Sequence, residues 1–316
     1  MRALVFDGRL RVTDLPDPEP GPGEALIHVL TAGVCNTDLE ILRGYMQFQG
    51  VPGHEFVGVV EHASNEHLRG KRVTGEITCA CGQCYYCQLE MPHHCLNRSV
   101  LGILNRNGAF AEYLTLPEEN LHLVPGTIRD DIAVFTEPTA AAFRILEQVT
   151  IADTDRVVVL GDGKLGQLAA QVVWLRTKRV LCVGKHAWKL ELLNRLHIPT
   201  ALVEDPVEPG ADIVIEATGS EEGLARALEV VRPEGTVILK TTVAEPVQLA
   251  LSVPVVVNEV KLVGSRCWPF RPALEALALG NVEVRPMISE TYGIEDGVRA
   301  LERAGVPDVL KVLLYM

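Results

Sequence analysis

Four cysteines lie close together in the chain, separated by two, two and seven residues: Cys81, Cys84, Cys87 and Cys95. Four thiolates at this spacing can bind one tetrahedral zinc ion at about 2.3 Å per bond, which leaves no open coordination position. The alternatives are a disulfide cluster, or thiols packed as small hydrophobic groups. Because one metal ion accounts for the whole spacing, we predict a structural zinc lobe at about residues 79–96. A closed site of this kind does no chemistry itself.

A glycine-rich hexapeptide follows the apolar run 157–160 and precedes a helical pattern. Its residues are Gly161, Asp162, Gly163, Lys164, Leu165 and Gly166. In a Rossmann fold the first glycine allows a tight turn, the second lets the backbone approach a pyrophosphate, and the third packs helix against strand. The helix N-terminus supplies N–H donors to the anion. The motif therefore predicts a dinucleotide-binding loop, and the alternative is an ordinary glycine-rich turn.

The end of the next strand is where this fold commonly places an acidic residue that binds the ribose 2′-hydroxyl of NAD. Here the chain has Gly184, followed by Lys185 and His186. A missing carboxylate removes repulsion against the 2′-phosphate of NADP, and the two basic side chains could attract it. The sequence therefore favours NADP slightly over NAD. In the alternative interpretation both basic residues are solvent-exposed, and NAD binds without an acidic partner.

A second and weaker metal pattern consists of Cys35, the adjacent pair His54 and Glu55, and Glu137. A thiolate, an imidazole and a carboxylate with an open fourth position would make a catalytic zinc site. Spacing alone does not distinguish this from a buried thiol and a structural histidine.

The hydrophobic pattern changes along the chain. The first third has short apolar runs separated by Pro and Gly, which is typical of β-structure. After about residue 138, strands alternate with helices, and this alternation predicts an α/β fold with a doubly wound parallel sheet. We expect a first domain at residues 1–138, a dinucleotide-binding domain at 139–264, and a segment at 265–316 that returns to complete the first domain. That segment should contain a helix at 272–279 and a strand at 309–314.

Composition excludes several classes of protein. The chain has 316 residues, 47% of them hydrophobic and 22% charged, which is ordinary for a globular protein of two domains. The formal net charge of −12 argues against nucleic acid as a partner. No apolar run approaches the roughly 20 residues that span a membrane, and residues 1–8 are typical of a strand and turn rather than a signal peptide. We expect a cytoplasmic protein, in which cysteines favour metal or catalytic roles over disulfides.

The whole chain resembles the zinc-dependent medium-chain dehydrogenases/reductases of the alcohol dehydrogenase superfamily, most closely the sorbitol, threonine and glucose dehydrogenase branch. The matching blocks run in the family's order and cover most of the sequence: residues 33–38, 52–58, the four-cysteine lobe, 108–113, 136–138 and 161–166. The resemblance implies a β-rich GroES-like catalytic domain joined to a Rossmann domain. It also implies a homodimer or homotetramer, with residues 258–263 as the edge that joins the subunits.

The resemblance also assigns roles in a catalytic zinc site. Cys35 and His54 would bind the zinc, and Glu55 would bind it directly or enter and leave its coordination shell. Glu137 stands where the ethanol-oxidising enzymes have a cysteine, which makes the site harder and favours a polar or polyhydroxylated substrate. Thr37 would hydrogen-bond the substrate hydroxyl and start its proton toward solvent, and Asp38 would orient His54. Without the resemblance, Thr37 is a turn residue and Asp38 a helix cap.

We therefore expect an enzyme that reversibly oxidises a secondary alcohol, a polyol or a sugar hydroxyl with NADP or NAD, and that binds two zinc ions per chain. Its partner would be a small alcohol or carbonyl compound, with neither nucleic acid nor membrane involved. One alternative is a zinc-free reductase of the quinone or enone type on the same fold. Another is a non-catalytic sensor that binds NADP(H), which a single zinc site and no turnover of alcohols would favour.

Overall fold

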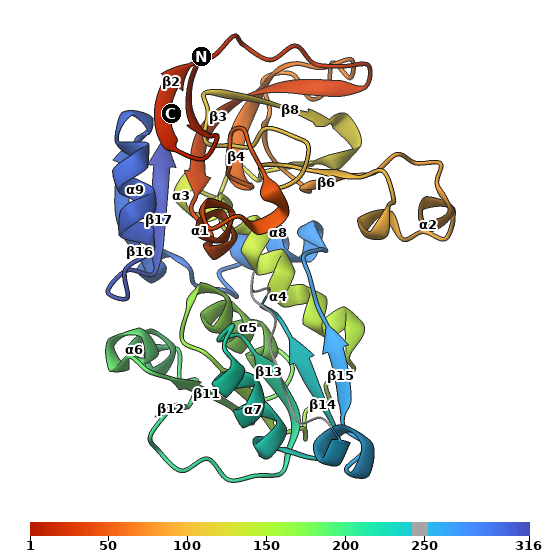
Figure 1. The fold of residues 1–316 in the computed structure, drawn as a ribbon, viewed down its shortest axis with the longest axis vertical. Helices are drawn as coiled ribbons and strands as arrows, with labels where there is room; N and C mark the ends of the chain where they lie inside the picture. The colour runs from red at the N-terminus through yellow and green to blue at the C-terminus, as the bar shows by residue number, and fades with distance from the viewer. Residues whose placement is uncertain (242–251) are drawn as a thin grey trace. The chain divides into compact units, whose positions relative to one another are not determined.

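The computed structural model describes residues 1–241 and 252–316, and these form two compact units (Figure 1). The first unit consists of residues 1–137 and 288–316, and the second of residues 138–287. Each unit has its own sheet. Among the described residues, no helix is long and apolar enough to cross a membrane.

The first unit is built mainly of β-strands: β1 (Arg2–Phe6), β2 (Leu10–Asp14), β3 (Glu24–Gly33), β4 (Glu55–His62), β5 (Arg72–Gly75), β6 (Thr78–Cys79), β7 (Ser99–Val100), β8 (Tyr113–Pro117), β9 (Leu121–Leu123), β16 (Ile288–Gly293) and β17 (Lys311–Tyr315). Its helices are short: α1 (Asn36–Leu42), α2 (Tyr85–Gln88), α3 (Asp130–Ala133) and α9 (Gly297–Ala304). The main sheet has the strand order β16-β17-β3-β4-β5-β9, and β8 also pairs with β3. Fully buried apolar side chains such as Phe56, Phe110 and Leu116 form its core.

The second unit has a six-stranded parallel sheet: β10 (Val157–Leu160), β11 (Val180–Gly184), β12 (Thr200–Leu202), β13 (Ala211–Glu216), β14 (Val231–Leu239) and β15 (Lys261–Gly264). Its spatial order is β12-β11-β10-β13-β14-β15. Counted from β10, this is 3-2-1-4-5-6, the strand order of the Rossmann fold. The predicted doubly wound α/β fold is therefore confirmed.

Helices cover the two faces of this sheet: α4 (Thr136–Gln148), which crosses from the first unit into the second, α5 (Lys164–Trp174), α6 (Ala187–Arg195) and α7 (Glu221–Val230). A further helix, α8 (Phe270–Ala278), packs against α4. The fully buried strand β10 shows why both faces are covered. Val157 and Val159 pack on one side with residues of α5 and α6, whereas Val158 and Leu160 pack on the other with residues of α7. Alternate side chains of a strand point to opposite faces, so a continuous apolar run needs cover on both.

The return to the first unit comes later in the chain than we predicted. The second unit extends to Met287 rather than ending at residue 264. Two sets of contacts hold the intervening segment there. Phe270 and Ala273 of α8 pack against Ala140 of α4, and the side-chain amide of Gln171 exchanges hydrogen bonds with the backbone of Glu283. The predicted helix and closing strand of this segment are present as α8 and β17.

Candidate metal sites and dinucleotide-binding loop

The ends of paired strands bring together three residues of the second metal pattern, Cys35, His54 and Glu55. β3 pairs antiparallel with β4, with Gly33 opposite Glu55, and with β17 on its other side. Cys35 follows β3 as the residue that caps α1, and His54 directly precedes β4. The register of β3 and β4 places both segments at the same end of the sheet, although α1 and further residues lie between them in the chain.

Cys35, His54 and Glu55 form a compact donor group. Their ligand atoms all lie within 4.8 Å of one another. His54 is 3% exposed and Glu55 1%, while Cys35 is partly exposed at the rim. The Oε1 atom of Glu55 is buried without a hydrogen-bond partner among the described residues. A buried carboxylate oxygen needs a hydrogen-bond donor or a cation. A thiol, an imidazole and this oxygen together fit a zinc ion.

Asp38 contacts Cys35 and His54 from the buried side of the donor group. Its Oδ2 accepts a hydrogen bond from the backbone N–H of Cys35 at 2.8 Å, and its Oδ1 lies 3.2 Å from His54 Nδ1. Asp38 is fully buried, and it acts as a helix cap and as the carboxylate beside the imidazole at once. Burial alone would lower the pKa of His54, but the Asp38 carboxylate and the Cys35 thiol outweigh burial and raise that pKa well above its usual range.

Thr37 lies in the first turn of α1 with its Oγ1 3.8 Å from Cys35 Sγ. Like Cys35, it is partly exposed, so its hydroxyl lies beside the donor group on the accessible side. Asp38, by contrast, is on the buried side. The short helix α1 therefore presents one side chain to each side of the site.

Glu137 is not a member of the donor group. It is buried, 7% exposed, and lies in the first turn of α4. Only Cys35, His54 and Glu55 among the described residues have their ligand atoms within the 4.8 Å limit at this site. Whether Glu137 binds zinc therefore stays a prediction, and Glu55 is the carboxylate that the geometry places with the thiol and the imidazole.

Lys311, the first residue of β17, is a site residue that the sequence analysis missed. Its ammonium group forms a buried ion pair with Glu55 Oε2, and it donates a hydrogen bond to the Val34 carbonyl at 3.2 Å. Both side chains are 1% exposed. The available signal was one lysine inside the apolar run 309–314, because a lysine is almost never buried without a charged partner.

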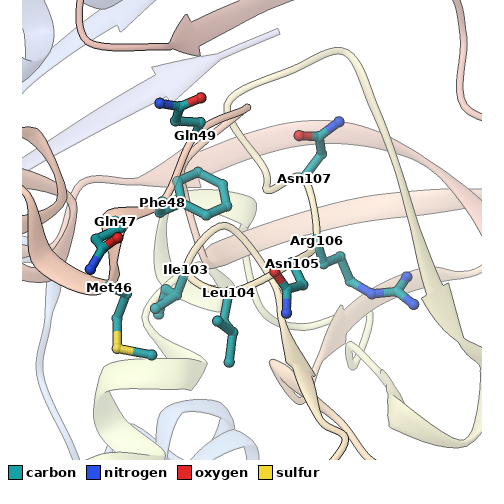
Figure 2. A pocket seen from close by; sticks show the side chains of 9 residues that line it. All are labelled: Met46, Gln47, Phe48, Gln49, Ile103, Leu104, Asn105, Arg106 and Asn107. Atoms are coloured by element: carbon teal, nitrogen blue, oxygen red, sulfur yellow. The ribbon is translucent and has the colours of Figure 1, made fainter.

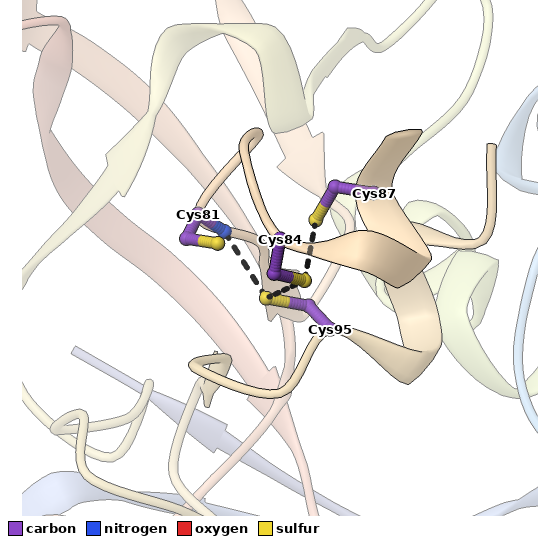
Figure 3. Close-up of side chains that lie close together, drawn as sticks. All are labelled: Cys81, Cys84, Cys87 and Cys95. Carbon is purple, nitrogen blue, oxygen red and sulfur yellow. Dashed lines mark hydrogen bonds between the residues drawn. The ribbon is translucent and has the colours of Figure 1, made fainter. Parts of the chain in front are cut away.

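The four cysteines of the predicted zinc lobe also converge (Figure 3). Cys84 Sγ lies 3.5 Å from Cys87 Sγ and 3.7 Å from Cys95 Sγ. Bonds of about 2.3 Å in a tetrahedral zinc site place sulfurs about 3.8 Å apart, so these separations fit one ion. All eight cysteines of the chain are free, which removes the disulfide alternative. The segment contains two short helical turns, because Cys87 lies in α2 and a 3₁₀ helix, Pro92–His94, precedes Cys95.

The thiols of this lobe differ in acidity. Backbone N–H groups of Cys87 and Leu96 lower the pKa of Cys84 to about 6. Desolvation and the neighbouring Cys84 and Cys95 side chains raise the pKa of Cys87 to about 12. Close thiolates repel one another, so not all of them ionise together without a cation. A divalent ion supplies that cation, and the donor set fits it.

The glycine loop between β10 and α5 has the geometry that its sequence predicts. Gly161 has φ +118°, and a Cβ atom there would lie 2.7 Å from the Ala217 carbonyl oxygen. A Cβ atom at Gly163 would meet nothing within 4 Å. Gly163 caps α5, and Lys164 and Leu165 begin its first turn. Open space beside the N-terminal N–H groups of a helix fits a pyrophosphate.

Comparison with known proteins identifies the family of the chain. The family model of the alcohol dehydrogenase GroES-like domain matches residues 21–126. An L-threonine 3-dehydrogenase of Streptomyces avermitilis is 31% identical, and a sorbitol dehydrogenase of Halalkalibacterium halodurans is 29% identical, each over 99% of both chains. The chain belongs to the zinc-type medium-chain dehydrogenase/reductase family.

A solved structure resembles this dehydrogenase over its whole length. It is a candidate zinc-binding dehydrogenase from Sinorhizobium meliloti 1021, bound to NADP. The two share 27% identity, cover 100% of this chain and 99% of the other, and superpose with a TM-score of 0.89. The predicted combination of a GroES-like domain and a Rossmann domain is thereby confirmed.

The end of β11 in this dehydrogenase differs from what we expected of it. Gly184, Lys185 and His186 lie at the expected place, but Asp162 reaches them from the glycine loop. Its Oδ2 accepts a hydrogen bond from the His186 backbone N–H at 2.6 Å and lies 3.0 Å from His186 Nδ1. The premise that this region has no carboxylate is therefore wrong.

A separate pocket of about 260 Å³ lies in the first unit of the dehydrogenase (Figure 2). Two loops line it, residues 46–49 and 103–107. Met46, Gln47 and Asn105 have left-handed backbone conformations, with φ between 50° and 57°, which is uncommon for residues other than glycine. None of the predicted site residues lines this pocket.

Proposed function

We propose that this chain is a zinc-dependent dehydrogenase that reversibly oxidises a secondary alcohol, a polyol or a sugar hydroxyl with NAD(P). The observation that carries the proposal is the donor group of Cys35, His54 and Glu55, in which three ligand atoms lie within 4.8 Å of one another. Relatives of the chain over nearly its full length are named for the oxidation of sorbitol and threonine, both of which bear a secondary hydroxyl.

Two zinc ions per chain follow from this proposal. Cys35, His54 and Glu55 would hold the first, with Glu137 available to exchange with Glu55, and the four cysteines of the lobe would hold the second. When bound, the first zinc supplies a Lewis acid that makes a substrate hydroxyl more acidic, and the nicotinamide accepts the hydride. The closed cysteine site supplies only structure.

The residues around the first site have distinct tasks in the proposed reaction. Asp38 fixes the orientation of His54 and of the Cys35 backbone through its two oxygens. Thr37, beside Cys35 and partly exposed, would hydrogen-bond the substrate hydroxyl and relay its proton toward solvent by passing on the proton of its own hydroxyl. Lys311 neutralises one oxygen of Glu55, which leaves the other for the metal.

Turnover by variants at Thr37 tests the proposal. Wild-type protein is assayed with sugars, polyols, amino alcohols and simple secondary alcohols, with NAD and NADP in separate reactions. Thr37→Val should lower kcat by about 100-fold or more, because a side chain positioned for proton transfer contributes at least that much. Thr37→Ser keeps the hydroxyl and should retain most of the activity.

Metal analysis of the purified protein separates this proposal from its rivals. We expect two zinc ions per chain and loss of alcohol oxidation after treatment with a chelator. One zinc ion per chain, together with no oxidation of any alcohol in the panel, would instead support a non-catalytic sensor of NADP(H). Turnover of quinones or enones that is insensitive to chelators would support a zinc-free reductase.

A further inference from the structure

The carboxylate of Asp162 occupies the space that Gly184 leaves open. A Cβ atom built at Gly184 would collide with Asp162, with Cβ, Cγ and Oδ2 of that side chain all closer than 3.0 Å. The acidic group that many Rossmann folds carry at the end of the second strand is therefore supplied here by the glycine loop. A side chain at position 184 and the aspartate at position 162 cannot both occupy this space.

The side chain of Asp162 is held in this place by His186. One oxygen, Oδ2, accepts from the His186 backbone N–H at 2.6 Å and lies 3.0 Å from Nδ1 of its ring. The other, Oδ1, has no hydrogen-bond or ion-pair partner among residues 1–241 and 252–316. The Asp162 side chain is only 10% exposed, so this acceptor has a fixed position beside the glycine loop.

This arrangement changes the charge that a cofactor would meet. Asp162 places a carboxylate 3.0 Å from Nδ1 of His186, so a negative charge lies beside this side chain. Lys185 is exposed and forms no ion pair within the described part of the chain. A carboxylate in a mostly buried position is screened little by solvent and repels a phosphate dianion strongly. The region therefore lacks the purely positive charge that Lys185 and His186 indicated in the sequence.

We propose that Asp162 selects the cofactor: its Oδ1 accepts a hydrogen bond from the adenosine ribose 2′-hydroxyl, and its charge disfavours a 2′-phosphate, so the enzyme prefers NAD. The proposal rests on the dinucleotide-binding part of the proposed function. It reverses the slight preference for NADP predicted from Lys185 and His186. It also assigns a binding role to a glycine-loop position that the fingerprint leaves unspecified.

Binding of two nucleotide fragments tests the proposal without any turnover. Calorimetry measures the Kd of the full-length protein for ADP-ribose and for 2′-phospho-ADP-ribose. Wild-type protein should bind ADP-ribose at least tenfold more tightly. Asp162→Asn keeps the shape and a hydrogen-bond acceptor but removes the charge, and it should reduce that ratio by about tenfold or more. Asp155→Asn is the control.

Asp155 makes a suitable match because its Oδ2 accepts from the Ala152 backbone N–H at 2.8 Å in a turn that precedes β10. It therefore lies at the opposite end of that strand from the glycine loop, and its neutralisation should leave the ratio unchanged. An unchanged ratio in Asp162→Asn, or equal binding of both fragments by wild-type protein, would overturn the proposal.

A double variant that moves the carboxylate from position 162 to position 184 controls for loss of binding through misfolding. Gly184→Asp alone collides with Asp162, so it is combined with Asp162→Gly, which returns the acidic group to the end of β11. The double variant should regain the preference for ADP-ribose that Asp162→Gly alone loses. If it does not, the position of the carboxylate does not set the preference, and the proposal fails.

Alcohol oxidation distinguishes the two proposals from each other. The predicted binding ratios without oxidation of any alcohol would refute the dehydrogenase and leave the role of Asp162 intact. Alcohol oxidation together with a binding ratio that does not depend on Asp162 would support the dehydrogenase and refute the role of Asp162. Binding of neither fragment would overturn both.

Discussion

Individual residues of this site serve more than one purpose. The Asp38 carboxylate accepts a hydrogen bond from the Cys35 backbone N–H and so caps the turn after β3, and the same side chain lies beside His54. Glu55 likewise divides its two oxygens, one for Lys311 and one with no protein partner among the described residues. A substitution at either position therefore disturbs folding and the metal site together, and variants must be chosen to separate the two effects.

Lys311 offers such a separation. Lys311→Met leaves Glu55 buried without its cation and should lower the free energy of unfolding by about 3–5 kcal/mol. The double variant Lys311→Met with Glu55→Gln removes the uncompensated charge and should recover much of this loss. Urea denaturation measures both. Lys71→Met, the same change at an exposed lysine, should cost little. A single variant at Lys311 that loses less than about 1 kcal/mol would contradict a buried ion pair.

At the scale of elements, the cysteine lobe has little to stabilise it except a metal ion. It consists of a four-residue helix and a three-residue 3₁₀ helix, with Tyr85, Leu89 and Leu96 more than half exposed. A segment with so few buried apolar groups does not fold on packing alone. A zinc ion held by the four cysteines would take the place of a hydrophobic core in this part of the chain.

Loss of one ligand should therefore release one metal ion and loosen the lobe. In Cys95→Ser, elemental analysis should find one zinc ion per chain fewer than in wild-type protein, and proteolysis should cut within residues 81–97. The variant should be less stable than wild-type protein, whereas the molecules that remain folded should keep most of their activity. Cys79→Ser changes a buried cysteine that lies outside the four-sulfur group and should keep both zinc ions. Full zinc content in Cys95→Ser would exclude the four-cysteine site.

The contact between β16 and α9 has a predictable response to acid. Arg303 and Tyr292 donate hydrogen bonds to Glu290 and lower the pKa of its carboxyl group to about 2. Because this value is below that of an unfolded glutamate, about 4.3, the ionised pair stabilises the fold above about pH 4.3. The stabilisation decreases as the pH falls toward 2.

Glu290→Gln should therefore lower the Tm by about 1–2 °C at pH 7, as expected for a partly exposed ion pair in a chain of this size. The difference from wild-type protein should shrink below pH 4 and vanish near pH 2. Scanning calorimetry across this range measures it. Glu295→Gln, a change at an exposed glutamate of the same unit, is the control. A difference that persists unchanged at pH 2 would contradict the lowered pKa.

Across the whole molecule, the features that could be predicted from the sequence are those set by residues close together along the chain. The parallel sheet, the turn at Gly161 and the convergence of four cysteines each depend on spacing within a few tens of residues. Two contacts were not predictable in this way. The pairs Glu55–Lys311 and Asp162–His186 arise from sheet register and from side-chain direction, which single-sequence patterns do not encode. The same limit explains the late return to the first unit.

The distance between Glu55 and Lys311 along the chain is 256 residues, and this matters when the protein is made. At about 5–20 residues per second, the lysine leaves the ribosome about 10–50 s after the glutamate. During that interval the first sheet lacks β17, and its buried carboxylate lacks a cation. The second unit, a continuous segment that ends at Met287, is complete before the first. Each nascent chain therefore exposes an unfinished sheet edge while its dinucleotide-binding unit can already fold, and this is the period in which a chaperone would bind it.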